Sequence, residues 1–503
     1  MSAVTKAGVV GAGTMGAGIA QALAQAGTPA VVFDADPDVA QRAIELVTKN
    51  LRKGAERGRW SEEEAAAALE RVTTTGTIDE LAGCSLVIEA VPERLDIKRD
   101  VLARLAEVCG EETVLATNTS SLLVSSIAAT TPVPERVVGM HFFNPAPLMG
   151  LVEVVPGLRT SQPAVDLAVA TVEAMGKRAI VAADGIGFVV NRCARPFYGE
   201  AFRLLAEGRA EVEQIDRICR LGGGFRMGPF ELIDLIGVDV NFEIASSFFE
   251  QSFCEPRWQP SPIQGRLVAA GLHGRKSGRG FYDYTDGPPH SDLPTPPPAG
   301  GGEGRLVAIH GDGAIADGLR GLASDAGFST DGGKAEPWLT IDAGLDPGSD
   351  LGSGPRVVSC ASQSLARRGA PGAMGFSLLT PDSALVELTR NPQTDPEAAA
   401  RADEFFASLG LLREEVGDCP GLVLGRIVAQ IVNEAAFAWG EGVATQEDID
   451  AGLMLGLNFP AGPFDWASRI GTPEVRAILD GLWDERHDPR YRAAPALVVG
   501  ELS

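Results

Sequence analysis

A gapless internal repeat constrains the fold of this 503-residue chain more than any other feature of its sequence. The segments that start at Gly187 and Gly421 align with a constant shift of 234 residues. The same shift continues upstream, where Leu151-Val152-Glu153 meets Leu385-Val386-Glu387. A match of this length without a gap is improbable by chance, so two copies of one structural unit are expected.

Before the repeat's helical part, short apolar runs alternate with helical patterns. The expected strands are Ala7–Val10, Ala30–Phe33, Leu86–Ala90, Val114–Ala116 and Val137–Met140. The expected helices are Gly16–Ala26, Pro37–Gly54, Ser61–Arg71 and Ile97–Cys109, followed by Phe188–Glu207, Val212–Arg220 and Pro229–Ile236. This order predicts an α/β domain of Rossmann type with a parallel, doubly wound sheet, and then an all-α domain.

One Pro- and Gly-rich segment divides the chain. Residues 285–304 read TDGPPHSDLPTPPPAGGGEG and show no apolar period, which is typical of a linker. Together with the repeat, it predicts five parts. They are a Rossmann-like domain at 1–185, a helical domain at 186–284, the linker at 285–304, a degenerate Rossmann-like domain at 305–419 and a second helical domain at 420–503.

Composition excludes several classes of protein. The net charge of −24 opposes general nucleic-acid binding, and no run of 18 apolar residues predicts a membrane span. A strand pattern begins at Ala7, which leaves no room for a signal peptide. The seven cysteines are scattered without metal-ligand spacing, so we expect reduced thiols, no metal and a cytoplasmic location.

A glycine-rich loop follows the first expected strand. Gly11, Gly13 and Gly16 form a GxGxxG pattern that opens a helix, with Thr14 and Met15 between the second and third glycines. In this context the pattern predicts a pyrophosphate site at a helix N-terminus. Asp34 ends the next strand, where a carboxylate would accept hydrogen bonds from a ribose and repel a 2′-phosphate. The predicted cofactor is therefore NAD.

A histidine and a glutamate suggest hydroxyl oxidation. His141 follows the strand that is expected to end at Met140, and Glu153 stands twelve residues later in an apolar run. A buried carboxylate needs a partner, and an imidazole held by one can take a hydroxyl proton. A structural histidine remains an equal alternative on spacing alone.

Two further polar positions lie near expected element ends. Thr117-Asn118-Thr119-Ser120-Ser121 follows a strand and could either contact a ligand or cap the next helix. Asn191 lies among apolar residues on a predicted helix, which favours a polar contact to something bound.

At these residues the chain resembles the 3-hydroxyacyl-CoA dehydrogenase family. The resemblance rests on motifs that run in order from residue 8 to residue 284: GAGTMG, VIEAVPERLDIK, TNTSSL, HFFNPAPLMGLVEVV, GFVVNR, MGPFELIDLIGVD and GRKSGRGFYDY. The part of the chain after Thr285 resembles a second, decayed copy, as in long bacterial forms associated with phenylacetate breakdown.

The resemblance implies residue roles. It makes His141 the general base, oriented by Glu153. It places Ser120 and Asn191 at the substrate oxygens and the nicotinamide, and Asn144 at the substrate. It also places Asn118 and Glu93 near the nicotinamide, Lys98 within reach of cofactor or substrate, and coenzyme A contacts around Asn50 and Arg57. A solvated helix face is the alternative for the Asn50 to Arg57 stretch.

The second copy has lost most of these residues. Under the 234-residue shift, Gly375 replaces His141 and Gly425 replaces Asn191, while Glu387 survives in the place of Glu153. Leu378 likewise stands for Asn144. We expect a structural remnant whose helical domain packs on the first as an intramolecular pseudo-dimer, because large apolar faces mark interfaces. Further self-association stays open.

The predicted reaction is NAD-dependent oxidation of an (S)-3-hydroxyacyl-CoA. The acyl group stays open between 3-hydroxybutyryl and 3-hydroxyadipyl. One alternative is a dehydrogenase of a free hydroxy acid on the same fold, which dependence on coenzyme A would distinguish. Another is a non-catalytic NAD-binding scaffold, which should lack His141 or Glu153, yet the first copy has both.

Overall fold

The computed structural model describes residues 4–287, 294–331, 335–345 and 354–500. The chain divides into two compact units. The first contains Met1–Arg192 and Glu441–Leu457, and the second contains Cys193–Gly440 and Asn458–Ser503. Within the described ranges, no helix is long and apolar enough to cross a membrane.

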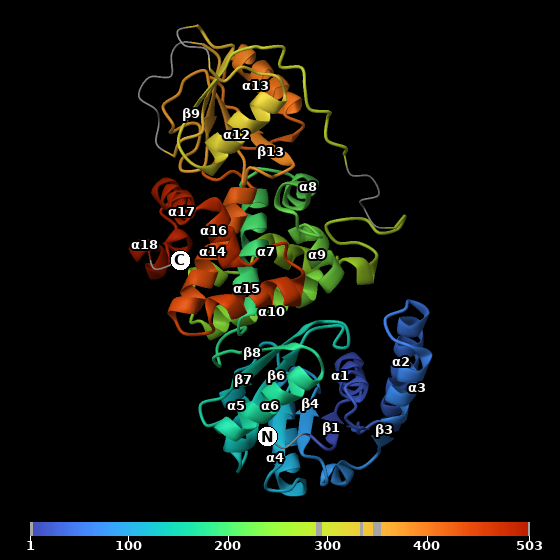
Figure 1. Cartoon of the computed structure of the whole chain (residues 1–503). Helices are drawn as coiled ribbons and strands as arrows, with labels where there is room; N and C mark the ends of the chain where they lie inside the picture. Colours follow the sequence, from blue (N-terminus) through green and yellow to red (C-terminus); the bar gives the residue numbers. More distant parts are fainter. Residues whose placement is uncertain (1–3, 288–293, 332–334, 346–353, 501–503) are drawn as a thin grey trace. The chain divides into compact units, whose positions relative to one another are not determined.

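The first unit is built on an eight-stranded sheet with the order β3-β2-β1-β4-β5-β6-β7-β8 (Figure 1). Its strands are β1 Ala7–Val10, β2 Ala30–Phe33, β3 Val72–Thr75, β4 Leu86–Glu89, β5 Val114–Thr117, β6 Val137–Phe142, β7 Leu151–Pro156 and β8 Arg178–Val181. Its helices are α1 Thr14–Gln25, α2 Pro37–Glu56, α3 Glu62–Glu70, α4 Leu95–Val108, α5 Val124–Ala128 and α6 Gln162–Ala174, with 3₁₀ turns at Ile78–Leu81 and Pro134–Arg136. Strands β1, β4 and β5 are buried throughout, as expected for strands covered by helices on both faces.

Two strands depart from the predicted parallel sheet. β7 is antiparallel to β6 and β8 is parallel to β7, so both run opposite to the other six strands, whose neighbouring pairs are parallel. The connection from Phe143 to Gly150 carries Pro145 and Pro147 and is too short for a crossover helix, so the chain turns back. β6 also extends to Phe142, so the predicted end of the strand at Met140 was wrong and His141 lies inside the strand.

Helices α2 and α3 form a hairpin beside α1. Asp36 caps α2 through its side chain, and Ser61 with Glu64 forms a capping box at the start of α3. Trp60 packs so closely on Gly54 that a Cβ there would lie 1.8 Å from the indole, and its Nε1 donates to the carbonyl of Leu51 at 2.7 Å. The Trp60 indole therefore holds the C-terminal end of α2, from Asn50 to Arg57, in place.

The second unit contains helices from both copies and a six-stranded sheet. The first copy supplies α7 Val190–Ala206, which begins in the first unit, α8 Val212–Gly223, α9 Pro229–Ile236, α10 Val238–Gln251 and α11 Pro262–Ala269, with 3₁₀ turns at Pro256–Trp258 and Arg275–Ser277. The second copy supplies α14 Leu424–Gly440, α16 Pro463–Ile470, α17 Thr472–Arg486 and α18 Pro495–Val499, with a 3₁₀ turn, η5, at Pro489–Tyr491. Its helix α15, Gln446–Leu457, belongs to the first unit and packs against β7.

The six-stranded sheet is a shortened version of the first. Its order is β14-β13-β12-β11-β10-β9, with β9 Val307–His310, β10 Leu339–Asp342, β11 Arg356–Ser359, β12 Met374–Ser377, β13 Leu385–Thr389 and β14 Leu412–Glu415. Two helices, α12 Ala314–Asp325 and α13 Pro396–Ser408, pack on it. As β6 and β7 do in the first sheet, β12 and β13 run antiparallel. β9 is the edge strand, and apart from a single parallel bridge between Leu306 and Ser329 the described residues contain no strand in the place of β2 or β3.

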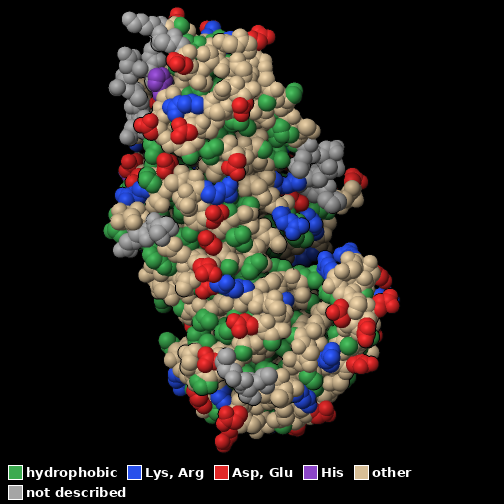
Figure 2. All heavy atoms as spheres, viewed as in Figure 1, with side chains coloured by type: hydrophobic (Ala, Val, Ile, Leu, Met, Phe, Trp, Pro, Cys, Tyr) green, Lys and Arg blue, Asp and Glu red, His purple; other side chains and the backbone are tan. Residues whose placement is uncertain are grey.

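Charges are interspersed on the surface. Figure 2 shows acidic and basic side chains alternating over the visible face. All seven cysteines are free thiols, and six of them are buried. Among the residues that the structure describes, no group of three or more His, Cys, Asp or Glu could hold a metal ion.

Candidate active site

The glycine loop after β1 has the geometry that a dinucleotide requires. Gly11 has φ +99°, and a Cβ there would lie 2.7 Å from the Ala90 carbonyl oxygen. A Cβ at Gly16 would overlap the Gly11 carbonyl oxygen at 1.8 Å, so this glycine lets α1 approach the loop. Gly13 faces open space, which leaves its backbone accessible to a ligand.

Asp34 lies at the end of β2 beside this loop. Its Oδ2 accepts a hydrogen bond from Ala12 N at 2.8 Å, and its Oδ1 accepts one from Asp36 N at 3.0 Å. A cavity of about 610 Å³ connects the acid with the loop. It is lined by Val10, Gly11, Gly13, Thr14, Met15, Phe33, Asp34, Ala35, Val39, Ala90, Val91, Pro92, Ile97 and Val101. Five of the residues predicted to bind NAD therefore face one apolar-walled cavity, which fits the cofactor.

His141 and Glu153 face each other across β6 and β7. The antiparallel register pairs the two residues directly, and His141 Nδ1 lies 2.6 Å from Glu153 Oε2. Both side chains are buried, with 7% and 0% exposed. The imidazole packs against the rings of Phe143 and Phe188, at 4.5 and 5.8 Å between ring centroids. Its orientation is therefore fixed on several sides.

The other oxygen of Glu153 is held by the start of α7. Oε1 accepts hydrogen bonds from Val189 N and Val190 N, both at 2.9 Å. The turn that aims these two amides places Phe188 at φ +50°, which is uncommon for a bulky residue. Glu153, on β7, thus contacts both the histidine on β6 and the backbone at the start of α7.

A partly exposed carboxylate, Glu93, organises the loop after β5. Glu93 Oε1 accepts hydrogen bonds from Thr119 Oγ1 at 2.7 Å, Ser120 N at 2.8 Å and Ser121 N at 2.9 Å. Burial alone would raise the pKa of Glu93, but Lys98 and these hydrogen bonds lower it to about 2. Glu93 therefore stays ionised and holds the loop in one conformation.

Lys98 does not reach outward as the resemblance implied. Its side chain is 1% exposed, and its ammonium lies 2.9 Å from Glu89 Oε1 and 3.2 Å from Glu93 Oε2. Two ion pairs thus hold it inside the α/β unit.

Ser120, Asn191 and Asn118 are joined to this region by hydrogen bonds within the protein. Asn191 Nδ2 donates to the Ser120 carbonyl oxygen at 3.4 Å. Asn118 Oδ1 accepts from Phe142 N at 2.8 Å, which joins the end of β5 to the residue after His141. The alternative that the segment Thr117 to Ser121 caps the next helix is not what the structure shows. The N-cap residue of α5 is Leu123, and no side-chain hydrogen bond caps this helix.

Asn50 and Arg57 line a separate cavity of about 220 Å³. Its other lining residues are Gln21, Lys53, Gly54, Arg59, Trp60, Pro145, Pro147 and Leu148. The wall thus combines basic side chains at the end of α2 and just after it with the segment that comes after His141, and Asn144 is exposed at the start of that segment. The arrangement can attract a ligand with negatively charged groups close to the end of β6.

The second copy retains the carboxylate clamp without a base. Glu387 accepts hydrogen bonds from Val423 N at 2.7 Å and Leu424 N at 3.0 Å, as Glu153 does in the first copy. A Cβ at Gly375 would lie 2.6 Å from both Cys360 Sγ and Thr389 Cγ2, so these side chains fill the space a histidine would need. Burial raises the pKa of Glu387 to about 8, against the two backbone hydrogen bonds.

Two positioning carboxylates escaped prediction from sequence. Glu89 is 0% exposed and contacts Lys98, Thr117 Oγ1 at 2.6 Å and Val91 N at 2.7 Å. Asp184 accepts from Val124 N at 2.8 Å and Ser125 N at 2.7 Å. Glu89, like Glu153, is an acid within an apolar run, so the signal that identified Glu153 would also have identified Glu89. Asp184 lies in an irregular segment and gave no such signal.

Two family profiles match the chain. The one described as "3-hydroxyacyl-CoA dehydrogenase, NAD binding domain" matches residues 6–185. The one described as "3-hydroxyacyl-CoA dehydrogenase, C-terminal domain" matches twice, at residues 187–284 and 421–499. The second match falls on the helical part of the internal repeat.

Curated relatives cover either the whole chain or its first half. The chain is 36% identical to 3-hydroxyadipyl-CoA dehydrogenase of Escherichia coli over 490 residues, which is 97% of this chain and 96% of that protein. It is 40% identical over 278 residues to a probable 3-hydroxybutyryl-CoA dehydrogenase of Bacillus subtilis, covering 55% of this chain and 96% of that protein. A crystal structure of 3-hydroxybutyryl-CoA dehydrogenase from Escherichia coli K12 superimposes with a TM-score of 0.85 at 34% identity, covering 100% of this chain and 99% of the other.

Proposed function

The chain belongs to the 3-hydroxyacyl-CoA dehydrogenase family, and from that premise we propose that its first copy carries the reaction, with His141 as the base. The protein oxidises a 3-hydroxyacyl-CoA with NAD. The single observation behind the assignment to His141 is its 2.6 Å contact with the buried, amide-bound Glu153.

The geometry supports Nε2 of His141 as the nitrogen that acts. An ionised carboxylate only accepts hydrogen bonds, so Glu153 requires the proton of the neutral imidazole to be on Nδ1. Nε2 then has a free lone pair that can take the substrate hydroxyl proton. As the imidazolium forms, Glu153 stabilises its charge without moving, because two amides already hold the other carboxylate oxygen.

The remaining roles are assigned from position. When bound, NAD accepts the hydride that leaves C3 of the substrate. Gly11 and Gly13 would hold its pyrophosphate and Asp34 its ribose. Ser120 and Asn191 would hydrogen-bond the substrate, and Asn144 would lie where the acyl-CoA enters. Arg57, with Asn50, would contact the coenzyme A.

We propose a short or dicarboxylic acyl group, in line with the names of the relatives. The test is NADH formation from 3-hydroxybutyryl-CoA, 3-hydroxyadipyl-CoA and free 3-hydroxybutyrate. Turnover of at least one CoA ester and none of the free acid supports the proposal. Equal turnover of the free acid would instead favour a hydroxy-acid dehydrogenase, the alternative function.

Asp34 is expected to select NAD over NADP. Replacing Asp34 with alanine and Ala35 with arginine should shift the ratio of kcat/KM values toward NADP, because repulsion is removed and a phosphate partner is added. The single variant Asp36→Ala is the matched control, since that acid caps α2. Wild-type enzyme that used both cofactors with equal efficiency would contradict this role.

One NAD is expected to bind per chain. In the second copy β9 is the edge strand, so the described residues include no ribose-binding strand like β2. Calorimetric titration should give one equivalent of NAD for each polypeptide. Two equivalents would show that the second α/β domain has a cofactor site of its own.

We also propose that the two helical copies pack as a pseudo-dimer within one chain. Reciprocal contacts support this, since a two-fold interface pairs each contact with its mirror. Ala183 N donates to Val443 O at 2.9 Å, and 234 residues on, Gly417 N donates to Arg209 O at 2.6 Å. Likewise Arg192 pairs with Glu441 at 2.7 Å, and Arg426 pairs with Glu207 at 2.9 Å.

The domain boundaries and the location complete the proposal. Boundaries near 185, 284, 304 and 419 are compatible with the two sheets and the helices between them. Residues 288–293 of the predicted linker lie outside the described residues. A cytoplasmic location is compatible with seven free thiols.

A further inference from the structure

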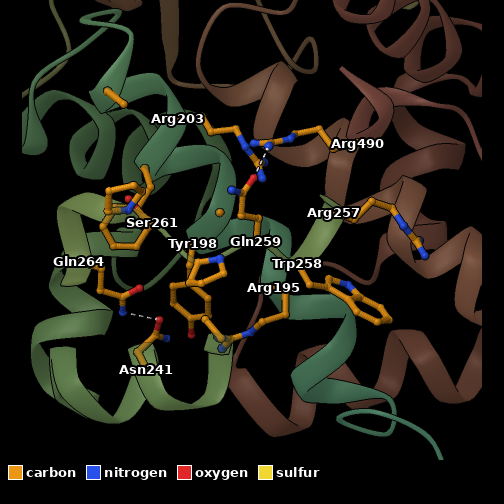
Figure 3. Close-up of a pocket in the computed structure, with 16 residues that line it drawn as sticks. Arg195, Tyr198, Arg203, Asn241, Arg257, Trp258, Gln259, Ser261, Gln264 and Arg490 are labelled. Carbon is orange, nitrogen blue, oxygen red and sulfur yellow. Dashed lines mark hydrogen bonds between the residues drawn. The ribbon is translucent and has the colours of Figure 1, made fainter. Parts of the chain in front are cut away.

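A small cavity in the second unit has no part in the proposed reaction. It measures about 160 Å³ and lies between α7, α10, the segment 257–264 and Arg490 of the second copy (Figure 3). Four arginines line it: Arg195, Arg203, Arg257 and Arg490. The question is whether the protein itself balances these four charges.

Three of the four arginines have a carboxylate partner. The pairs are Arg203 with Glu200, Arg257 with Glu434 at 2.8 Å, and Arg490 with Asp488 at 2.9 Å. Each of these three arginines thus has a carboxylate partner within the folded chain, and Glu200 is shared with Arg426. The fourth arginine has no such partner among the described residues.

Arg195 is different. It is 8% exposed, and its guanidinium lies over the rings of Tyr198 and Phe248, at 4.9 and 5.6 Å from their centroids. Its Nε is buried without an acceptor, and no described residue forms an ion pair or hydrogen bond with its guanidinium. A guanidinium stays protonated in proteins, and a buried charge without a counterion is costly. The site therefore lacks one negative charge.

Asn241 also has an unused donor at this cavity. Its Oδ1 accepts from Gln264 Nε2 at 2.9 Å, but its buried Nδ2 has no acceptor. Figure 3 shows Asn241 with Gln264 on the same side of the cavity as Tyr198. Arg195 and Asn241 together offer spare hydrogen-bond donors, which call for a ligand rich in acceptors.

The rest of the wall limits the size and polarity of the ligand. Phe202, Trp258, Pro260 and Pro262 contribute apolar surface. The volume of about 160 Å³ is close to that of a protein cavity that holds benzene, so about six heavy atoms fit. An oxyanion with a short hydrocarbon tail meets both requirements, whereas inorganic phosphate would leave the apolar wall uncovered.

We propose that this cavity binds a small organic monocarboxylate, with the carboxylate on Arg195 and Asn241 and the tail against Trp258 and the prolines. The site belongs to the first copy alone, because the repeat places Ala429 at the position of Arg195. It is independent of the proposed catalytic role of His141.

Titration calorimetry of the full chain with butyrate tests this. Wild type should bind one equivalent, and Arg195→Met, which keeps the side-chain stem, should weaken binding about tenfold or more. Arg226→Met is the matched control, since Arg226 is an exposed arginine of the same unit, and should leave the affinity unchanged. His141→Ala should also retain the equivalent, which separates this site from acyl binding at the catalytic histidine.

Two further ligands and one variant sharpen the result. Butyramide has the shape of butyrate without its charge and should not bind measurably. Arg195→Lys should bind butyrate more tightly than Arg195→Met. Equal affinity in wild type and Arg195→Met, equal binding of butyramide, or Arg195-dependent binding of phosphate but not of butyrate would each overturn the proposal.

Discussion

Replacing His141 with alanine should lower kcat by about 10²- to 10⁴-fold, because general-base catalysis contributes that much. The Kd for NAD should change by less than about threefold, which is under 1 kcal/mol. The reason is that the glycine loop and Asp34 follow β1 and β2, whereas His141 lies on β6. Steady-state assays and calorimetry measure the two quantities separately. Activity within about threefold of wild type would remove His141 from its proposed role.

The two carboxylate clamps provide a matched pair of controls. Glu153→Gln removes the charge that supports the imidazolium and should lower kcat severalfold or more with NAD binding retained. Glu387→Gln alters the equivalent position of the second copy. Burial raises the pKa of Glu387 to about 8, so at pH 7 the carboxyl is mostly protonated and glutamine resembles it. A similar loss of activity in both variants would indicate a general structural effect.

Replacing Arg426 with methionine should lower the free energy of unfolding by about 3–5 kcal/mol, the usual cost of removing one partner of a buried ion pair, because the buried Glu200 then keeps only Arg203 as a cationic partner among the described residues. The side chains of Arg426 and Glu200 are both 0% exposed, with 2.7 Å between Nε and Oε2. Arg426 also donates to Glu207 and to the hydroxyl of Tyr491. Burial alone would lower the pKa of Arg426, but Glu200 and Tyr491 hold it well above its usual value. Urea unfolding monitored by circular dichroism measures the change.

Arg192 is the control for this prediction, because the repeat makes it the counterpart of Arg426. Its partner Glu441 is 50% exposed, so water screens the pair and can solvate the remaining carboxylate. Arg192→Met should therefore cost less than Arg426→Met. Equal costs, or a negligible cost for Arg426→Met, would contradict the view that the buried cluster joins the two helical copies.

Local sequence signals predicted much of the first sheet. The strands at Ala7–Val10 and Ala30–Phe33 and the helix at Pro229–Ile236 have the predicted bounds, since uniform burial and capping residues mark them. Strands β3, β7 and β8 were not among the expected strands, although β7 had been noted as an apolar run. β3 carries the exposed residues Thr73 and Thr74 and β8 the exposed Arg178 and Val181, so neither shows the apolar run of a buried strand.

Long-range pairing could not be predicted in the same way. The sequence predicted His141 and Glu153 as partners from their chemistry, but it expected the strand to end before His141. The antiparallel return of β7 places the two residues opposite each other, and that depends on how the chain turns between two strands. The burial of Lys98 between Glu89 and Glu93 likewise depends on α4 packing against the sheet.

By itself, the sequence determined the duplication, the NAD-type glycine loop, the family resemblance and the loss of the base from the second copy. Each of these depends on residue identity and short spacing, which determine local conformation and chemistry. Only the tertiary structure decided which charges are paired. Arg426 and Arg195 are both buried arginines of the helical copies, yet the first has Glu200 and the second has no carboxylate among the described residues. This difference between the two arginines depends on residues that lie far apart in the chain, because desolvation and pairing depend on the complete packing around each charge.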